Sequence, residues 1–160
     1  MTLHLWRIAA LTPAYPAEDM TGGGAKATGG RWNAKGTAVL YTSENRALAC
    51  LETVVHVVSG GFPLNRILVR IDVPEDVWKA ATIFDTADPK NVGWDVEPAG
   101  KVSIDAGTAW VNGGASALLV VPSIIVPEEM NILINPAHPD AAKIKATKIR
   151  KWTYDTRLKR

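Results

Sequence analysis

Short β-prone apolar runs, broken by proline or glycine, dominate the pattern of this sequence. Runs of this kind predict strands at residues 3–9, 37–42, 66–73, 119–126, 131–135 and 145–154. The longest uninterrupted apolar stretches fall far short of the about 20 residues that a membrane-spanning helix needs. Many short strands beside few helices favour an α+β domain with a mixed sheet, whose strand order the sequence leaves open.

One segment, residues 43–59, has the apolar spacing of a helix. Ser43 is expected to cap this helix, and Glu44 in the first turn suits the helix dipole. Gly60 and Gly61 are expected to end it. The predicted buried stripe consists of Leu48, Leu51, Val54, Val55 and Val58.

Other segments are expected to be irregular. Residues 11–30 are rich in Pro, Gly, Ala and Thr and are interpreted as a loop. A loop this long in a small domain more often has a function than not. Residues 89–107 are also expected to be irregular, and residues 115–118 to form a helical turn.

The length of 160 residues suits a single domain, which we expect to span residues 1–160. Cys50 is the single cysteine, which excludes an internal disulfide framework and a cysteine-rich zinc site. A lone thiol is typical of a reducing cytoplasm. The N-terminus lacks the pattern of a secretory signal, so a soluble cytoplasmic protein is expected.

The charges nearly balance, with 18 Lys and Arg against 16 Asp and Glu. A net charge of +2 gives little support for nucleic-acid binding. The cations gather toward the C-terminus, where a solvated face is the favoured interpretation and a docking patch for an acidic partner the alternative. Signatures of phosphate loops, of His-Glu-x-x-His zinc sites and of dinucleotide-binding strand–helix turns are absent, and no metal site is expected.

The most unusual segment is Gly29–Gly36, in which glycines flank Arg31, Trp32 and Asn33. Glycine lets a backbone approach a ligand closely, and the fork of an arginine fits phosphate oxygens. The alternative is a tight turn whose arginine pairs with a carboxylate. Both interpretations remain open at this point.

Two further residues stand out. Tyr41 ends a predicted strand, where its ring either belongs to the core or faces a planar ligand. Glu52 lies beside the apolar stripe of the predicted helix, near Leu48 and Val55. A carboxylate there is solvated, paired or directed into a cleft, and His56 is a candidate partner one turn away.

These residues, in this order, resemble the RES domain family. The resemblance rests on Gly29-Gly30-Arg31-Trp32-Asn33, Gly36, Tyr41-Thr42-Ser43 and Glu52. It extends to Leu5-Trp6-Arg7-Ile8 and to the segments 116–123 and 131–139. It therefore spans most of the chain.

The resemblance implies an ADP-ribosyltransferase-like fold with a split β-sheet core, and the toxin of a bacterial toxin–antitoxin pair with an Xre-type antitoxin as partner. It implies NAD+ as substrate, with Arg31, Tyr41 and Glu52 as catalytic residues. Substrate binding is then expected from Arg7, Gly30, Arg31, Tyr41, Ser123 and Asn135.

Such an enzyme cleaves the bond between nicotinamide and ribose through an oxocarbenium-like state. Arg31 would hold the diphosphate or ribose, Tyr41 would orient the nicotinamide, and Glu52 would stabilise the growing positive charge. The acceptor of ADP-ribose, whether a protein, water or phosphate, stays open. A non-catalytic nucleotide-binding module and a nucleic-acid-binding toxin are the alternatives.

Overall fold

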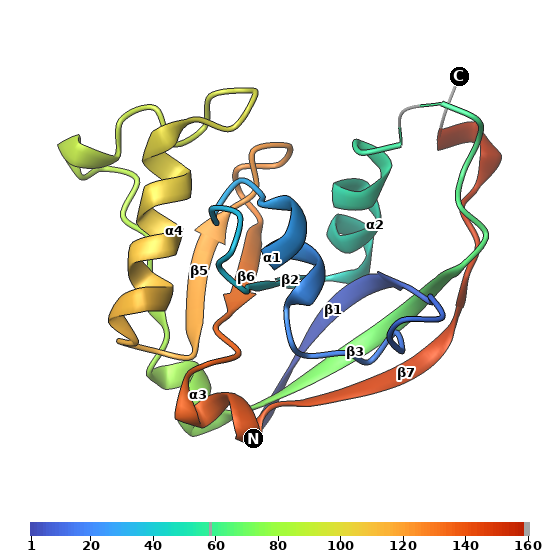
Figure 1. Cartoon of the computed structure of the whole chain (residues 1–160), viewed down its shortest axis with the longest axis horizontal. Coiled ribbons are helices and arrows are strands. Elements are labelled where there is room, and N and C mark those ends of the chain that lie inside the picture. The colour runs from blue at the N-terminus through green and yellow to red at the C-terminus, as the bar shows by residue number, and fades with distance from the viewer. Residues whose placement is uncertain (58, 159–160) are drawn as a thin grey trace.

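The computed structural model describes residues 1–57 and 59–158 (Figure 1). Its strands are β1 (Thr2–Ala10), β2 (Leu40–Ser43), β3 (Arg66–Pro74), β4 (Thr82–Ile83), β5 (Leu118–Pro122), β6 (Met130–Ile134) and β7 (Lys145–Trp152). Its α-helices are α1 (Gly23–Thr28), α2 (Arg46–Val54), α3 (Glu75–Lys79) and α4 (Lys101–Gly113). Short 3₁₀ turns cover Pro89–Asn91, Pro139–Lys143 and Thr156–Leu158.

The strands form one sheet in the order β4-β5-β6-β2-β1-β3-β7. β4 and β5 are parallel, and the other neighbours are antiparallel. The α+β prediction with a mixed sheet is thereby confirmed. Trp6 lies opposite Ser43 in the pairing of β1 with β2, and this pairing joins the two halves of the sheet.

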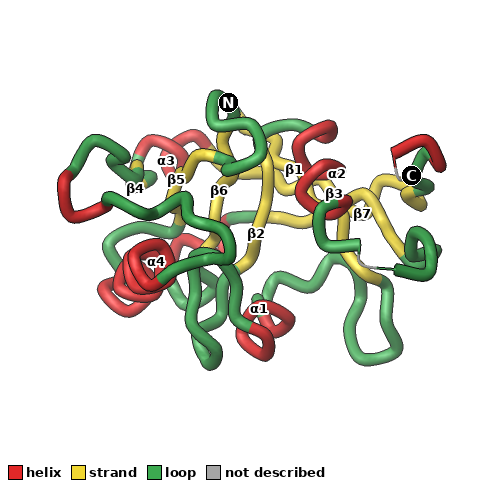
Figure 2. The backbone as a smooth tube through the Cα atoms, turned by 90° about the horizontal axis from the view of Figure 1, so that it is seen from above, coloured by secondary structure: helices red, strands yellow, loops and turns green. Residues whose placement is uncertain are grey.

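The two faces of the sheet have different coverings. One face, here called the helix-bearing face, carries α4 and α2. Trp110 of α4 packs with Leu119 and Leu133, and Ala49 of α2 packs with Trp6. Figures 1 and 2 show the two helices standing apart over β5 and β1.

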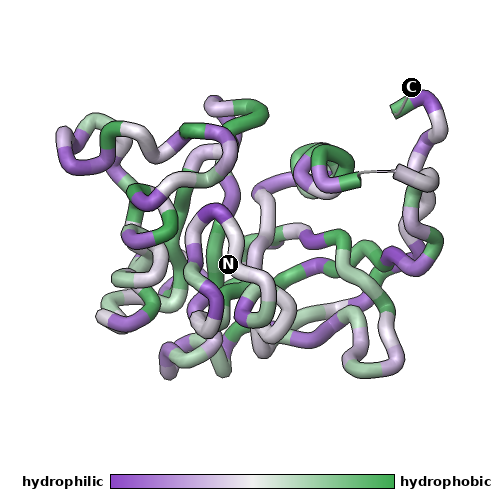
Figure 3. Tube along the Cα trace, turned by 45° about the horizontal axis from the view of Figure 1, so that its top comes forward, coloured by the Kyte–Doolittle hydropathy of each residue, from purple (hydrophilic) through white to green (hydrophobic). Residues whose placement is uncertain are grey.

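The other face, here called the inner face, holds the main core. Its buried apolar side chains come from both halves of the sheet, so the sheet curls around one cluster that includes Leu5, Val69, Leu40, Ile132 and Ile134. Figure 3 shows hydrophobic and hydrophilic stretches interspersed along the chain. Within residues 1–57 and 59–158, no helix is long and apolar enough to cross a membrane.

The helix predicted at residues 43–59 is shorter at both ends. Asn45 caps α2, because its side chain accepts a hydrogen bond from the backbone nitrogen of Leu48 at 2.8 Å. Ser43 instead ends β2, and Glu44 lies outside the helix. Val55 is 54% exposed, contrary to its place in the predicted stripe, and Val58 lies outside the described residues.

The largest error concerns α4, which begins inside the segment expected to be irregular. Gly107 obscured this helix, because a glycine in a helix interior lowers its propensity. The glycine has a packing reason: a Cβ at this position would lie 1.8 Å from the carbonyl oxygen of Trp32. Similarly, α1 forms within the loop predicted at residues 11–30, and residues 115–118 lead into β5 rather than forming a helical turn.

Candidate active site

The glycine-flanked segment forms a tight turn. The backbone nitrogen of Gly30 donates to the carbonyl of Asn33 at 3.0 Å, which places Arg31 and Trp32 in the two central positions. The indole of Trp32 is buried against Phe84 with a ring separation of 4.8 Å. The turn is therefore anchored to the core through Trp32.

Tyr41 locks this turn to the sheet. Its hydroxyl donates to Oδ1 of Asn33 at 2.6 Å and accepts from the backbone nitrogen of Trp32 at 3.0 Å. Burial raises the pKa of Tyr41 to about 12, although the hydrogen bond from Trp32 and the nearby Arg31 guanidinium oppose the shift. The phenol therefore stays protonated at neutral pH and does not act as a base there.

Gly30 fits tightly beside this lock. A Cβ at position 30 would lie 2.7 Å from the Tyr41 hydroxyl and 2.9 Å from Oδ1 of Asn33. The side-chain nitrogen of Asn33 donates to the carbonyls of Ala25 and Thr37, so the amide cannot readily move away. Because these two side chains lie so close to the backbone of residue 30, only glycine fits there without a shift of its neighbours.

Glu52 lies on α2 and faces the sheet, held by two neutral donors. Its Oε1 accepts from the hydroxyl of Ser123 at 2.8 Å and from the side-chain nitrogen of Asn131 at 2.6 Å. Both hydrogen bonds end on the same oxygen, and within the described residues no donor contacts Oε2. His56 is not its partner, contrary to one interpretation of the sequence.

Asn131 and Ser123 are themselves fixed. The hydroxyl of Ser43 donates to Oδ1 of Asn131 at 2.7 Å, in register across β2 and β6. The hydroxyl of Ser123 accepts from the backbone nitrogens of Ile125 and Val126. The carboxylate of Glu52 is thus oriented by groups that cannot easily rotate.

The structure brings Arg31, Tyr41 and Glu52 to one region of the helix-bearing face. Tyr41 and Ser43 point to the same face of β2, roughly 7 Å apart for two residues of strand. Glu52 reaches the asparagine opposite Ser43, and the Arg31 turn is bonded to Tyr41. No hydrogen bond or ion pair joins the three side chains to one another.

Arg31 already has partners of its own. Nη1 donates to the carbonyls of Trp94 and Val96 at 3.3 and 2.8 Å, and Nη2 pairs with the carboxylate of Glu97. The structure therefore contains the alternative that the sequence left open, a tight turn whose arginine pairs with a carboxylate.

The structure places Arg7 away from this region and holds Asn135 against the end of α4. Arg7 neighbours Trp6 on β1 and lies opposite Val69, so it points to the inner face, with the sheet between it and Glu52. Burial lowers its pKa, and Asp19 opposes this shift. Both amide atoms of Asn135 are occupied, by the carbonyl of Val111 and the backbone nitrogen of Ala137.

Sequence reasoning did not place Asn131, Ser43 or Asn33 among the expected site residues. A polar residue within the apolar run 131–135 was a weak signal for Asn131. Its meaning depends on the pairing of β6 with β2, which the sequence did not reveal. The buried Asn33 was part of the unusual segment, but its several hydrogen bonds follow only from the folded turn.

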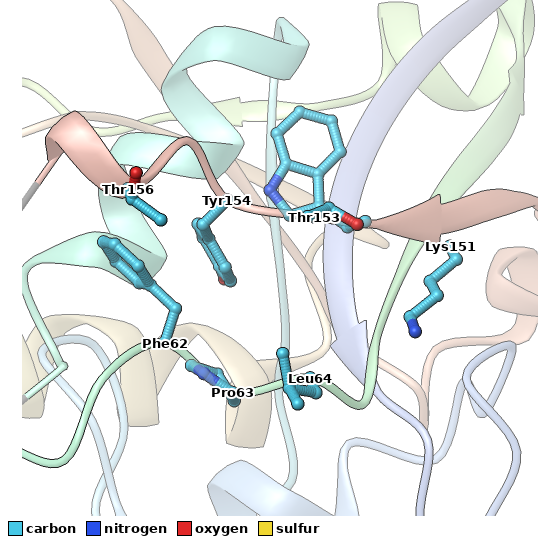
Figure 4. Close-up of a pocket in the computed structure, with 8 residues that line it drawn as sticks. Phe62, Pro63, Leu64, Lys151, Thr153, Tyr154 and Thr156 are labelled. Carbon is cyan, nitrogen blue, oxygen red and sulfur yellow. The ribbon is translucent and has the colours of Figure 1, made fainter.

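Two hollows described in the structure lie elsewhere. One lies between the segment after α2 and the end of β7 (Figure 4), and Phe62, Leu64, Trp152 and Tyr154 contribute to its lining. It contains Lys151 but no carboxylate. The second lies near Met20 and His138. Among the described residues, no group of three or more His, Cys, Asp or Glu side chains is arranged to hold a metal ion.

A comparison with protein families matches the RES domain to residues 4–157. The chain belongs to the RES domain family. The resemblance seen in the sequence is thereby confirmed over nearly the whole chain.

Curated relatives of this RES domain are named as toxins. The Prs ADP-ribosylating toxin of Sphingobium sp. (strain YBL2) is 59% identical over 160 residues, covering 99% of this chain and 98% of the relative. Toxin Res of Yersinia enterocolitica is 35% identical, covering 91% and 93%. Toxin Res of Pseudomonas putida is 33% identical, covering 96% and 98%.

Proposed function

We propose that this RES domain is the toxin of a bacterial toxin–antitoxin pair, and that it cleaves NAD+ in the cytoplasm and transfers ADP-ribose to a protein. Family membership and the name of the 59% identical relative support this proposal. That relative's name mentions Prs, so the corresponding protein is the first acceptor to test. An Xre-type antitoxin is the partner that we expect.

The observation that carries the proposal is the one-sided hydrogen bonding of Glu52. Ser123 and Asn131 hold Oε1, which fixes the carboxylate plane while Oε2 stays available within the described residues. A carboxylate oriented in this way suits a ribose hydroxyl and the positive charge that grows as nicotinamide departs. Glu52 is then the catalytic residue, and Ser123 and Asn131 are positioning residues.

In the first step, the bond between ribose C1′ and the nicotinamide nitrogen breaks, and both bonding electrons leave with neutral nicotinamide. Glu52 stabilises the resulting oxocarbenium charge. An acceptor then donates its lone pair to C1′ and loses a proton. Tyr41 does not supply a base near neutral pH, because its pKa is about 12. Its ring and the Arg31 turn bound the region where the dinucleotide would lie.

The direct test is incubation of the purified chain with NAD+. Release of nicotinamide, followed by chromatography, establishes the reaction class. Separate incubations add phosphate or the purified Prs protein, and mass spectrometry locates the ADP-ribose. A mass gain on Prs supports the transferase, whereas free ADP-ribose or its phosphate ester supports a hydrolase or a phosphorylase. Binding of NAD+ without nicotinamide release supports the non-catalytic module instead.

A further inference from the structure

The guanidinium of Arg31 is covered by the segment 94–97, which approaches it from another part of the fold. The arginine side chain is only 15% exposed, whereas the side chain of Glu97 is 71% exposed. Two backbone carbonyls and one carboxylate surround the same guanidinium. The group that the proposed function needs for the substrate is therefore already occupied.

The covering segment is held independently of Glu97. The indole of Trp94 stacks on Trp32 with a ring separation of 6.1 Å and meets Phe84 edge to face. The carbonyls of Trp94 and Val96 accept from Nη1 of the arginine. Because these contacts fix the segment, the carboxylate of Glu97 is not needed to keep it in place.

The contact of Glu97 is also the one that water can replace most easily. Its carboxylate is largely solvated, and an ion pair with one exposed partner contributes little to stability. When it leaves, Nη2 of Arg31 is free while Nη1 stays bonded to the two carbonyls. A guanidinium oriented in this way can accept another oxyanion, because carboxylates and phosphates fit the same planar fork.

We propose that Glu97 is a built-in competitor for the diphosphate of the dinucleotide. It neutralises Arg31 while the site is empty, and a phosphate oxygen takes its place when NAD+ binds. The inference rests on the proposed function and adds to it the residue that limits the affinity for the dinucleotide. No covalent bond changes in this exchange.

The test compares Glu97→Gln with Asp95→Asn, which removes one negative charge from an exposed residue of the same segment. Calorimetry measures the binding of ADP-ribose, which needs no turnover. Glu97→Gln is expected to lower the Kd for ADP-ribose about two- to fivefold, the range of an exposed ion pair, and Asp95→Asn to leave it unchanged. Glu97→Ala should act in the same direction. Adenosine, which has no phosphate, should bind the wild type and both Glu97 variants alike.

The inference is overturned if Glu97→Gln leaves ADP-ribose affinity unchanged or weakens it, or if Asp95→Asn strengthens it equally. In kinetics with NAD+, the expected pattern is a lower KM with an unchanged kcat. If Glu97→Gln binds ADP-ribose more tightly but the wild type releases no nicotinamide, the inference stands and the proposed enzyme is rejected. If the wild type releases nicotinamide but the two proteins bind ADP-ribose equally, the enzyme stands and the inference is rejected.

Discussion

The hydroxyl of Ser123 donates to Oε1 of Glu52 across 2.8 Å, although 71 positions separate the two residues in the chain. One residue follows β5 and the other lies on α2, so the bond ties the two halves of the molecule together over the site. A hydrogen bond to a charged acceptor is stronger than one between neutral groups. This contact both supports the fold and orients the carboxylate.

Replacing Ser123 with alanine should lower kcat for nicotinamide release by about tenfold, because one of the two donors that orient Glu52 is lost. The Kd for ADP-ribose should change little, and this difference separates positioning from a general loss of structure. Unfolding in urea should show a loss of about 1 kcal/mol, since two backbone nitrogens also lose their acceptor. An unchanged kcat would show that Ser123 is only structural.

Replacing Glu52 with glutamine should lower kcat by at least about a hundredfold, because the amide cannot neutralise the oxocarbenium charge. The amide oxygen still accepts from Ser123 and Asn131, so the fold should persist. The matched control is Glu128→Gln, an exposed position in the connection from β5 to β6. Equal rates of nicotinamide release from the two variants would rule out Glu52 as the catalytic carboxylate.

Stability should fall at high pH because of Tyr41. Its pKa is raised to about 12 in the folded state, against a usual value near 10, so its contribution is complete below pH 10. Between pH 10 and pH 12 the unfolded chain binds fewer protons, and the free energy of unfolding should drop by up to about 1.4 kcal/mol per pH unit. Urea titrations from pH 9 to 11.5 measure this slope.

Tyr41→Phe is the control for that titration. It should be less stable at pH 8 by about 1–3 kcal/mol, since the Asn33 amide and the Trp32 nitrogen lose their partner. Its stability should also fall less steeply above pH 10. Identical slopes for the two proteins would assign the alkaline loss to other groups.

Gly30→Ala should destabilise the protein by about 1–3 kcal/mol, because the added methyl would overlap the Tyr41 hydroxyl and the Asn33 amide. Gly24→Ala offers the comparison, since position 24 lies on α1 and a Cβ there meets nothing within 4 Å. That variant should be neutral or more stable. Thermal unfolding of both proteins measures the difference, and equal melting temperatures would contradict the tight fit at Gly30.

Strand positions could be predicted from the sequence where a short apolar run is enough to mark the strand. The strands β1, β3, β6 and β7 were expected close to their observed positions, and prolines mark the ends of β3 and β6. The helix α4 was missed because Gly107 weakens its propensity, while the contact that requires this glycine comes from Trp32. The cap of α2 moved from Ser43 to Asn45 because β2 uses Ser43 for a cross-strand bond.

The site depended on strand pairing more than on residue type. Glu52 stood out by its place on the predicted helix, but its donors follow from the register of β2 with β6. Arg7 was grouped with the site, yet the pairing of Trp6 with Ser43 turns its neighbour to the inner face. A shift of one residue in a strand reverses the face of every side chain, and no sequence pattern fixed that register.

The close packing of α4 against Trp32 limits how far the Arg31 turn can move. Gly107 brings the helix against one side of the Arg31 turn, and Tyr41 holds the other side. Contacts on both sides hold the turn, so we expect it to move little when a ligand binds. In the proposed exchange the carboxylate of Glu97 is therefore the group that moves, while the carbonyls of Trp94 and Val96 keep the arginine in place.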